Sequence, residues 1–223
     1  MQNVVLYILR KGQELENHED FYTYCPFIDS KGIKSIEEMP RPGPFKTHLP
    51  FTHVPYSPEA KYIYVLRNPK DCCVSMYYHT LRNSRARNQP FAEATFDNFF
   101  ELFMAGEVEY NDYYDHLMSW YPHLHDEQIF FTTYEDMKQD LKSVVLKIAS
   151  FLGQEYIDAI EKDNNVLNNI LRLSEFDYMK EHLSDVFNLP QRKKNQDDEI
   201  PVFTEKVSLV IGRIISHQNK TIE

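Results

Sequence analysis

The sequence predicts an α/β fold in which a parallel sheet is flanked by helices. Two short runs of β-forming residues, 62–66 and 129–133, lie between segments with helical periodicity. Strands that alternate with helices favour a parallel sheet, in which binding sites gather at the carboxyl ends of the strands. Arg67 follows one of these ends and Tyr134 follows the other, so both residues are candidates for a site.

The remaining elements follow from apolar spacing and from breakers along the chain. Residues 3–10 carry an apolar helical face that has no entry cap. Residues 12–44 contain several prolines and are expected to be loop-rich, and residues 83–94 are expected to form a polar loop. Further helices are expected over residues 69–82, 96–104, 112–120, 141–151 and 156–172.

Composition sets limits on the class of protein. With 223 residues, of which 42% are hydrophobic, the chain can form one globular domain with a full core. We assign this domain to residues 1–187 and leave residues 188–223 as an unassigned tail. The cysteines form no disulfide framework, which favours a reducing, cytoplasmic compartment. No apolar run reaches the roughly 18 residues of a membrane span, and a net charge of −10 argues against a nucleic-acid partner.

The segment after the first predicted strand has the features of an anion site. Asn68 is a good helix N-cap, and Pro69 suits the first helical position because its missing N–H costs nothing there. The helix therefore directs its free N–H groups and positive dipole end toward Arg67. Ser75 adds a hydroxyl two turns further on. These groups suit a phosphate, and a capped helix beside a solvated arginine is the alternative.

A second candidate is formed by Lys46 and His48, which lie two residues apart in an apolar segment. In an extended segment the two side chains fall on one face and can reach the same substrate atom. A histidine with a pKa of about 6.5 is a suitable general base at neutral pH. A lysine beside it can stabilise negative charge on a leaving oxygen. A histidine with a purely structural role is the alternative.

Together these segments resemble the cytosolic sulfotransferase family. The segments that carry the resemblance are KTHLP at 46–50, RNPKD at 67–71 followed by Ser75, and YEDMK at 134–138. FMAGEV at 103–108 and YYDH at 113–116 also resemble the family's FMxGxVxYGSWxDH region. The likeness runs from about residue 1 to residue 182, and the order and spacing of the motifs make it specific.

The resemblance implies a sulfotransferase fold, which is similar to that of P-loop nucleotide hydrolases. It also implies transfer of a sulfuryl group from PAPS (3′-phosphoadenosine 5′-phosphosulfate) to a hydroxyl or amine. The acceptor is expected to be a small aromatic or hydrophobic molecule. By this resemblance His48 removes the acceptor's proton and Lys46 lies near the bridging oxygen. No metal is expected, because the sequence contains no HExxH or CxxC motif.

The resemblance also implies which residues hold the nucleotide. Arg67 and Ser75 correspond to the residues that bind the 3′-phosphate of PAPS. Tyr134 corresponds to a tyrosine near the adenosine part. The late segment SEFDYMK resembles the family's TSFxxMK piece, so Ser174 and Phe176 correspond to the residues that contact adenine.

Three family segments have no counterpart in this sequence. The family's TYPKSGTxW segment forms a first strand and a phosphate loop, and residues 1–6 resemble the helix that follows it. The late RKGxxGDW segment is also missing, and the basic run at 192–194 is interpreted as solvated charge. The dimer-forming KxxxTVxxxE segment is not recognisable, which leaves a homodimer open.

These departures lead us to expect a truncated member of the family that lacks its first strand and phosphate loop and has little activity. Losing several donors to the phosphosulfate is costly, because one such donor is worth on the order of 10²–10³ in rate. A non-catalytic protein that binds small molecules or nucleotides is the alternative. A small-molecule kinase is disfavoured, because no GxxxxGK[ST] motif is present.

Overall fold

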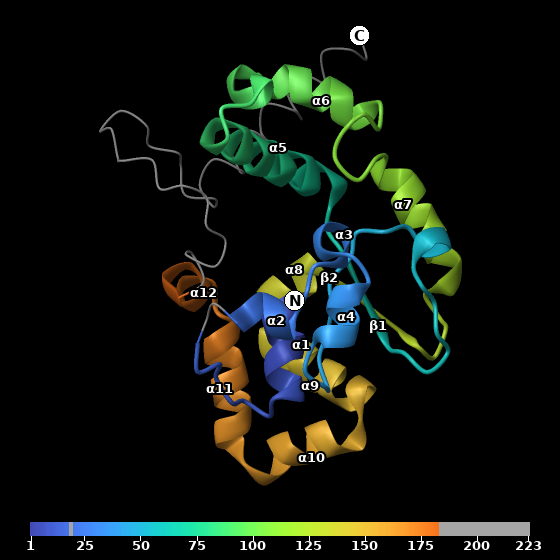
Figure 1. Cartoon of the computed structure of the whole chain (residues 1–223). Helices are drawn as coiled ribbons and strands as arrows, with labels where there is room; N and C mark the ends of the chain where they lie inside the picture. Colours follow the sequence, from blue (N-terminus) through green and yellow to red (C-terminus); the bar gives the residue numbers. More distant parts are fainter. Residues whose placement is uncertain (18–19, 183–223) are drawn as a thin grey trace. The chain divides into compact units, whose positions relative to one another are not determined.

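The computed structural model describes residues 1–17 and 20–182 (Figure 1). The described part divides into two compact units, one formed by residues 1–66 and 114–182 and the other by residues 67–113. The predicted domain boundary at residue 187 and the basic run at 192–194 lie outside the described residues. None of the helices in the described ranges is both long and apolar enough to cross a membrane.

The first unit contains the predicted parallel sheet. Strands β1 (Tyr62–Leu66) and β2 (Ile129–Thr133) pair in parallel, with Tyr62 opposite Ile129 and Leu66 opposite Thr133. Both strands have the predicted bounds. The sheet and its flanking helices confirm the α/β class, because parallel strands need a long connection and the connection here carries helices.

Alternate side chains of the two strands enter two separate apolar clusters. Ile63 and Phe130 are neighbours in the register and pack on the main helical core. Tyr64 and its partner Phe131 point to the opposite face, where they join a smaller cluster around Trp120. Because side chains alternate along a strand, the strongly apolar composition of both strands is explained by apolar packing on both faces.

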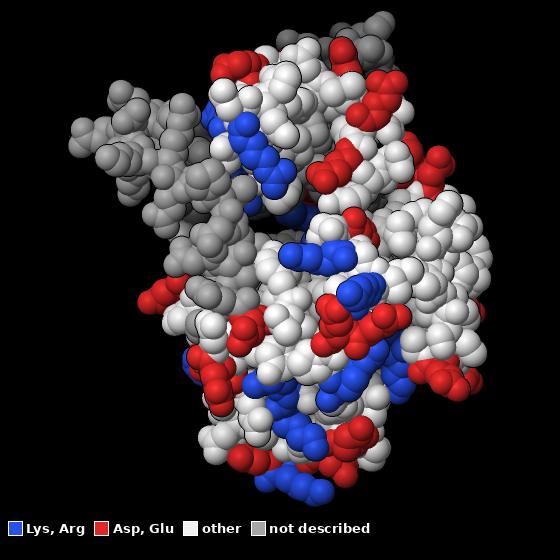
Figure 2. Space-filling view, viewed as in Figure 1, with Lys and Arg blue, Asp and Glu red and all other residues white. Residues whose placement is uncertain are grey.

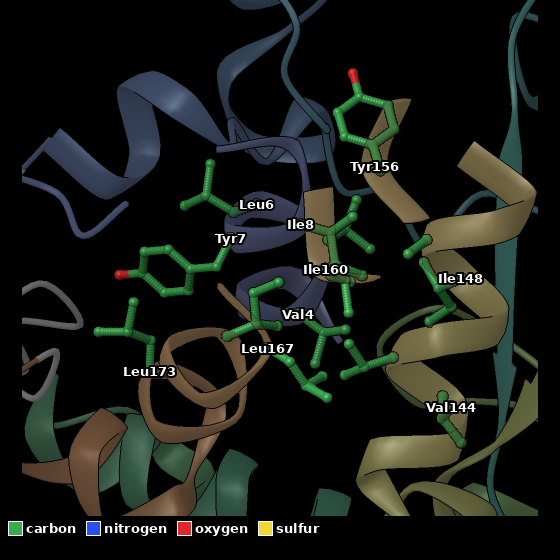
Figure 3. Packing of buried hydrophobic residues seen from close by; sticks show 14 of the residues in the cluster. Val4, Leu6, Tyr7, Ile8, Val144, Ile148, Tyr156, Ile160, Leu167 and Leu173 are labelled. Carbon is green, nitrogen blue, oxygen red and sulfur yellow. The ribbon is translucent and has the colours of Figure 1, made fainter. Parts of the chain in front are cut away.

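The main core of the first unit is built mostly from four helices: α1 (Gln2–Leu9), α9 (Leu141–Leu152), α10 (Gln154–Lys162) and α11 (Asn164–Ser174). Figure 3 shows their side chains converging on this core. Helix α1 has no side-chain cap at its N-terminus, and it packs against α9 and α11. A helix of this length is unstable alone, so tertiary packing stabilises it.

Gly12 allows the end of α1 to approach α11 closely. Its φ of 76° lies in the left-handed region, which favours glycine. A Cβ atom at this position would lie 2.9 Å from the carbonyl oxygen of Val166. A larger residue would therefore push the two helices apart.

Several local predictions were wrong. The helix expected over 156–172 is two helices, α10 and α11, because the Asp163 side chain accepts a hydrogen bond from the Asn165 N–H (2.9 Å) and starts a new helix there. Helix α8 (Tyr134–Gln139) was not predicted, although Thr133 and Asp136 form a capping box at its start. The region over 12–44, predicted to be loop-rich, also carries the short helices α2 (Phe21–Tyr24), α3 (Ile28–Lys31) and α4 (Lys34–Glu38) between its loops.

The connections around the sheet contain further short elements. They are η2 (Phe51–His53), α7 (Tyr113–Trp120), η4 (Tyr121–His123) and α12 (Phe176–His182). Helix α7 begins one residue later than predicted and ends at the predicted residue.

The second unit pairs two helices through aromatic side chains. Helix α5 (Pro69–Ala86) extends four residues beyond its predicted end, and η3 (Pro90–Glu93) lies in the expected polar loop. Helix α6 (Phe96–Met104) has the predicted bounds. Cys73 of α5 is buried with Phe99 and Phe103 of α6.

We expect Ile148→Ala to lower the free energy of unfolding by about 2–5 kcal/mol, because it leaves a cavity in the main core. Ile148 is 0% exposed. Ile33→Ala is the matched control, since Ile33 is 62% exposed and its truncation is expected to cost no more than about 0.5 kcal/mol. Urea denaturation of both variants measures the difference. Equal losses in the two variants would contradict the assignment of this core.

Candidate active site

A short parallel backbone pairing holds Lys46 beside the segment that precedes α3. The Lys46 N–H donates to the Pro26 carbonyl (2.8 Å), and the Ile28 N–H donates to the Lys46 carbonyl (3.0 Å). Phe27, which lies between these two residues, is the bridge partner of Lys46. Lys46 is therefore extended, as the interpretation of Lys46 and His48 required.

The side chains of Lys46 and His48 share the ring of Phe27. Lys46 Nζ lies 4.5 Å from the centre of this ring, in a cation–π contact. The His48 ring meets the same Phe27 ring edge-on, with 5.1 Å between the ring centres. The structure thus brings the two predicted residues together, and Phe27 is a contact that the sequence analysis missed.

Asp29 holds the backbone of His48 and lies beside its ring. Its Oδ2 accepts a hydrogen bond from the His48 N–H (2.8 Å) and lies 3.3 Å from His48 Nδ1. Its Oδ1 accepts a hydrogen bond from the Thr47 hydroxyl (2.6 Å). No pattern in the sequence pointed to Asp29, because the pair is 19 residues apart and belongs to no shared periodicity.

Helix α7 fixes the same segment from its other end. Trp120 Nε1 donates to the Leu49 carbonyl (3.3 Å), and Ser119 Oγ accepts from the Phe51 N–H (3.0 Å). His116 Nδ1 lies 3.2 Å from the hydroxyl of Tyr64, a buried residue of β1. The segment 46–51 therefore contacts elements that are distant in sequence on both sides.

The pKa of His48 is lowered to about 4, mainly because burial penalises the charged ring and also because Lys46 repels it. Asp29 acts in the opposite direction but does not offset these effects. The assumption that His48 has its ordinary pKa of about 6.5 was therefore wrong. At neutral pH its ring is neutral and able to accept a proton, although it is a weaker base than a free imidazole.

The pKa of His116 is also lowered, chiefly by burial. Hydrogen bonds to the backbone of His48 and Leu49 oppose this effect. A neutral His116 ring can use one nitrogen for the Tyr64 hydroxyl and the other for the backbone beside His48. His116 is a second residue of the site to which the residue-by-residue sequence reasoning gave no role.

In the second unit, the predicted cap at the start of α5 is confirmed. The Asn68 side chain accepts a hydrogen bond from the Lys70 N–H (3.0 Å), and Pro69 occupies the first helical position. The carbonyl of Arg67 accepts from the Tyr113 hydroxyl (2.6 Å), which fixes the backbone just before the cap. Ser75 is half-buried in α5. The N-terminus of this 18-residue helix can attract an anion.

The three remaining predicted residues lie at the ends of elements in the first unit. Tyr134 is exposed and starts α8, directly after β2. Ser174 is 9% exposed, and its hydroxyl has no hydrogen-bond partner among the described residues. Phe176 is 51% exposed at the start of α12.

Two sets of contacts set the position of Ser174 and Phe176. Asn3 Nδ2 of α1 donates to the Leu173 carbonyl (3.3 Å), which anchors the end of α11. Arg172 Nη2 and the Tyr178 hydroxyl both bind the carboxylate of Glu14, and the Arg172–Glu14 distance is 2.9 Å. These contacts tie α11 and α12 to the loop after α1.

Charge on the visible face of the molecule is mixed in sign. Figure 2 shows Lys and Arg side chains interspersed with Asp and Glu side chains on this face. The charges next to a residue, such as those of Lys46 and Asp29 beside His48, therefore say more about its protonation than the net charge of the chain does.

These features define a class of protein: an α/β protein with a neutral histidine beside a lysine in its first unit and a capped helix after an arginine in its second. Comparison with known proteins makes the class specific. The profile of the family described as "Sulfotransferase domain" matches residues 1–208. The chain belongs to this sulfotransferase family.

Similar proteins from mammals support the assignment. Sulfotransferase 1E1 of Cavia porcellus is 34% identical over 207 residues, which cover 88% of this chain and 67% of that protein. Amine sulfotransferase of Oryctolagus cuniculus is 38% identical over 166 residues, which cover 65% of this chain and 54% of that protein.

Among solved structures, mouse sulfotransferase SULT7A1 complexed with PAP aligns with a TM-score of 0.56 and 31% identity. The alignment covers 78% of this chain and 57% of that chain. Retinol dehydratase in a complex with retinol and PAP aligns with a TM-score of 0.62 and 19% identity, which supports the fold alone. The chain spans roughly half to two thirds of the length of these relatives.

We expect NMR titration to give His48 a pKa of about 4, and Lys46→Met to raise that pKa toward 6.5, because the variant removes a repelling charge. Lys142→Met, which changes an exposed lysine of α9, is the control and is expected to leave His48 unchanged. An unaltered pKa of His48 in Lys46→Met would show that the two side chains do not interact.

The same shift predicts a pH dependence of stability. The unfolded chain protonates His48 near pH 6.5, whereas the folded protein does so only near pH 4. The unfolded state therefore binds more protons in this window, and stability falls as the pH drops from 6.5 to 4. We expect His48→Gln to lose less stability than the wild type over this range in urea denaturation, since it removes the titrating group.

Proposed function

We propose that this protein transfers a sulfuryl group from PAPS to a hydroxyl or amine of a small acceptor. The observation that carries the proposal is the Lys46–His48 pair, in which a neutral histidine and a lysine share the ring of Phe27. The presence of PAP in the mouse sulfotransferase structure, which is 31% identical to this chain, supports the choice of donor.

In the proposed reaction, His48 accepts the proton of the acceptor's hydroxyl or amine. The acceptor atom then forms a bond to sulfur while the bond between sulfur and the bridging oxygen of PAPS breaks. PAP leaves with the bridging oxygen, and the positive charge of Lys46 stabilises the negative charge on that oxygen. Like phosphoryl transfer, this in-line displacement depends mainly on positioning and charge. The proposal requires no metal ion.

The proposed nucleotide contacts follow the residues described above. Arg67, the capped start of α5 and Ser75 offer positive charge and donors suited to the 3′-phosphate. Tyr134 and Phe176 offer exposed rings for the adenosine part, and the buried hydroxyl of Ser174 offers a hydrogen bond. A bound adenine would give this hydroxyl the partner that it lacks among the described residues.

The acceptor is proposed to be aromatic or hydrophobic, because aromatic side chains lie beside the Lys46–His48 segment and directly after it. Phe27 contacts both residues, and Phe51 stacks on His123 with 3.5 Å between the ring centres. Phe51 also meets Trp120 edge-on, with 5.2 Å between the centres. A panel of phenols and alcohols is therefore the appropriate first set of acceptors.

We expect His48→Ala to lower the rate of sulfate transfer from labelled PAPS to the phenol panel by about 10²–10⁴, the usual loss of a general base. His125→Ala is the matched control, because His125 is exposed and lies outside the site. Full activity of His48→Ala in a chain that turns over would exclude His48 as the base. PAP or phenol binding without any transfer would favour the alternative, a non-catalytic binding protein.

Nucleotide binding can be tested separately from transfer. We expect PAP at 100 times its Kd to stabilise the chain by about 2.7 kcal/mol in a thermal-shift titration. Ser174→Ala removes one neutral hydrogen bond and is expected to cost about 0.5–1.5 kcal/mol of binding, and Arg67→Ala about 1.5–3 kcal/mol. Arg87→Ala, at the other end of α5, is the control and should bind normally. Unchanged affinity in both site variants would refute the proposed contacts.

A further inference from the structure

The contacts of Asp29 are concentrated on two consecutive residues of the candidate active site. One carboxylate oxygen accepts from the Thr47 hydroxyl, and the other accepts from the His48 N–H and lies 3.3 Å from His48 Nδ1. The Thr47 hydroxyl oxygen in turn accepts from the Leu49 N–H (3.1 Å). One carboxylate thus orders the backbone of the proposed base and lies beside its ring.

The backbone pairing described above sets this geometry. Because Phe27 pairs with Lys46 in parallel, the two chains advance in the same direction and Asp29 arrives next to Thr47 and His48. Helix α3 starts directly after Phe27, and Asp29 is its second residue. The position of Asp29 is therefore fixed by backbone hydrogen bonds and does not depend only on its own side chain.

The ring of His48 has one nitrogen on the side of Asp29. Nδ1 faces the carboxylate, which leaves Nε2 as the nitrogen that can accept a proton from the acceptor. When Nε2 gains this proton, the Nδ1–H can donate to Asp29 Oδ2, and the new positive charge lies beside a negative one. Carboxylates play this role for catalytic histidines in other enzymes.

We propose that Asp29 is the positioning residue of His48, which orients the ring through the Thr47–His48 backbone and stabilises the protonated ring during transfer. This inference rests on the sulfuryl transfer proposed above. It adds a function for a residue of α3 whose role no sequence motif indicated.

Among residues 1–17 and 20–182, three ionisable side chains act on the protonated His48 ring. Lys46, on the same segment, repels it across the Phe27 ring, and His116 of α7 also disfavours its charge. Asp29 of α3 attracts it and favours the charged form. Burial adds to the repulsion, although the side chain is still 33% exposed. Without Asp29 a proton on His48 would be opposed by every one of these effects.

The chain contains a matched control pair. His123 Nδ1 lies 2.9 Å from Asp126 Oδ2, which is also a histidine–aspartate contact, but outside the Lys46–His48 segment. We would titrate His48 by NMR in the Lys46→Met background, where its pKa is expected at a more accessible pH. The variants are Asp29→Asn, which removes charge but keeps the shape, Asp29→Glu, which keeps charge, and Asp126→Asn.

We expect Asp29→Asn to lower the pKa of His48, and Asp126→Asn to leave the pKa of His48 unchanged. Asp29→Glu is expected to retain most of the effect of the native carboxylate on the pKa. An unchanged pKa of His48 in Asp29→Asn would overturn the proposal. If Asp29→Asn does not fold, the kcat of Asp29→Glu is the test. A reduced kcat supports a positioning role for Asp29, and an unchanged kcat contradicts it.

The second measurement is the pH profile of transfer in the otherwise wild-type chain. We expect Asp29→Asn to lower kcat on the order of 10²-fold with little change in KM, because a misplaced base costs about that much. Asp29→Glu should restore part of kcat, since it returns the charge but displaces the carboxylate. A kcat within threefold of wild type for both variants would exclude a positioning role for Asp29.

The two measurements separate this inference from the proposed function. Absence of transfer in the wild type, with a pKa of His48 that responds to Asp29→Asn, would refute the proposed function but keep the Asp29–His48 pairing. Transfer that is abolished by His48→Ala but unaffected by Asp29→Asn would keep the function and refute the role of Asp29.

Discussion

The parallel pairing of β1 with β2 is the interaction on which the rest of the first unit depends. It places Ile63 and Phe130 on the side of the helical core and Tyr64 and Phe131 on the side of Trp120. A shift of one residue would exchange the two faces and bury the wrong side chains. The pairing also places Tyr134 directly after the carboxyl end of β2, and binding sites in parallel sheets form at this edge.

A smaller parallel pairing, between Phe27 and Lys46, positions the side chains of the candidate site, as the pairing of β1 with β2 positions those of the core. It places the Phe27 ring against Lys46 and His48, and it aligns Asp29 with the backbone of His48. Backbone hydrogen bonds are directional, so they hold these side chains more tightly than apolar packing alone would. The chemistry of the site thus rests on main-chain geometry contributed by a segment with few regular elements.

The lowered pKa of His48 has two opposite effects: the neutral ring is available to accept a proton, but it is a weaker base. Burial and Lys46 lower its pKa to about 4, so the ring is neutral at physiological pH. The same effects oppose the protonated ring that the proposed transfer would form, and the charge of Asp29 favours it. In the proposed reaction Lys46 lies close in order to stabilise charge on the leaving oxygen, and a carboxylate that compensates for its repulsion of His48 is therefore useful.

Local sequence determined much of this protein: the bounds of β1, β2 and α6, the Asn68 cap and the spacing of Lys46 and His48 depend on neighbouring residues and are therefore legible from them. The break at Asp163 and the capping box at Thr133 were also local and could have been found. Only the tertiary structure decided the contacts of Asp29 and the pKa of His48. Both arise from residues brought together across the chain, and desolvation depends on packing that no local pattern encodes.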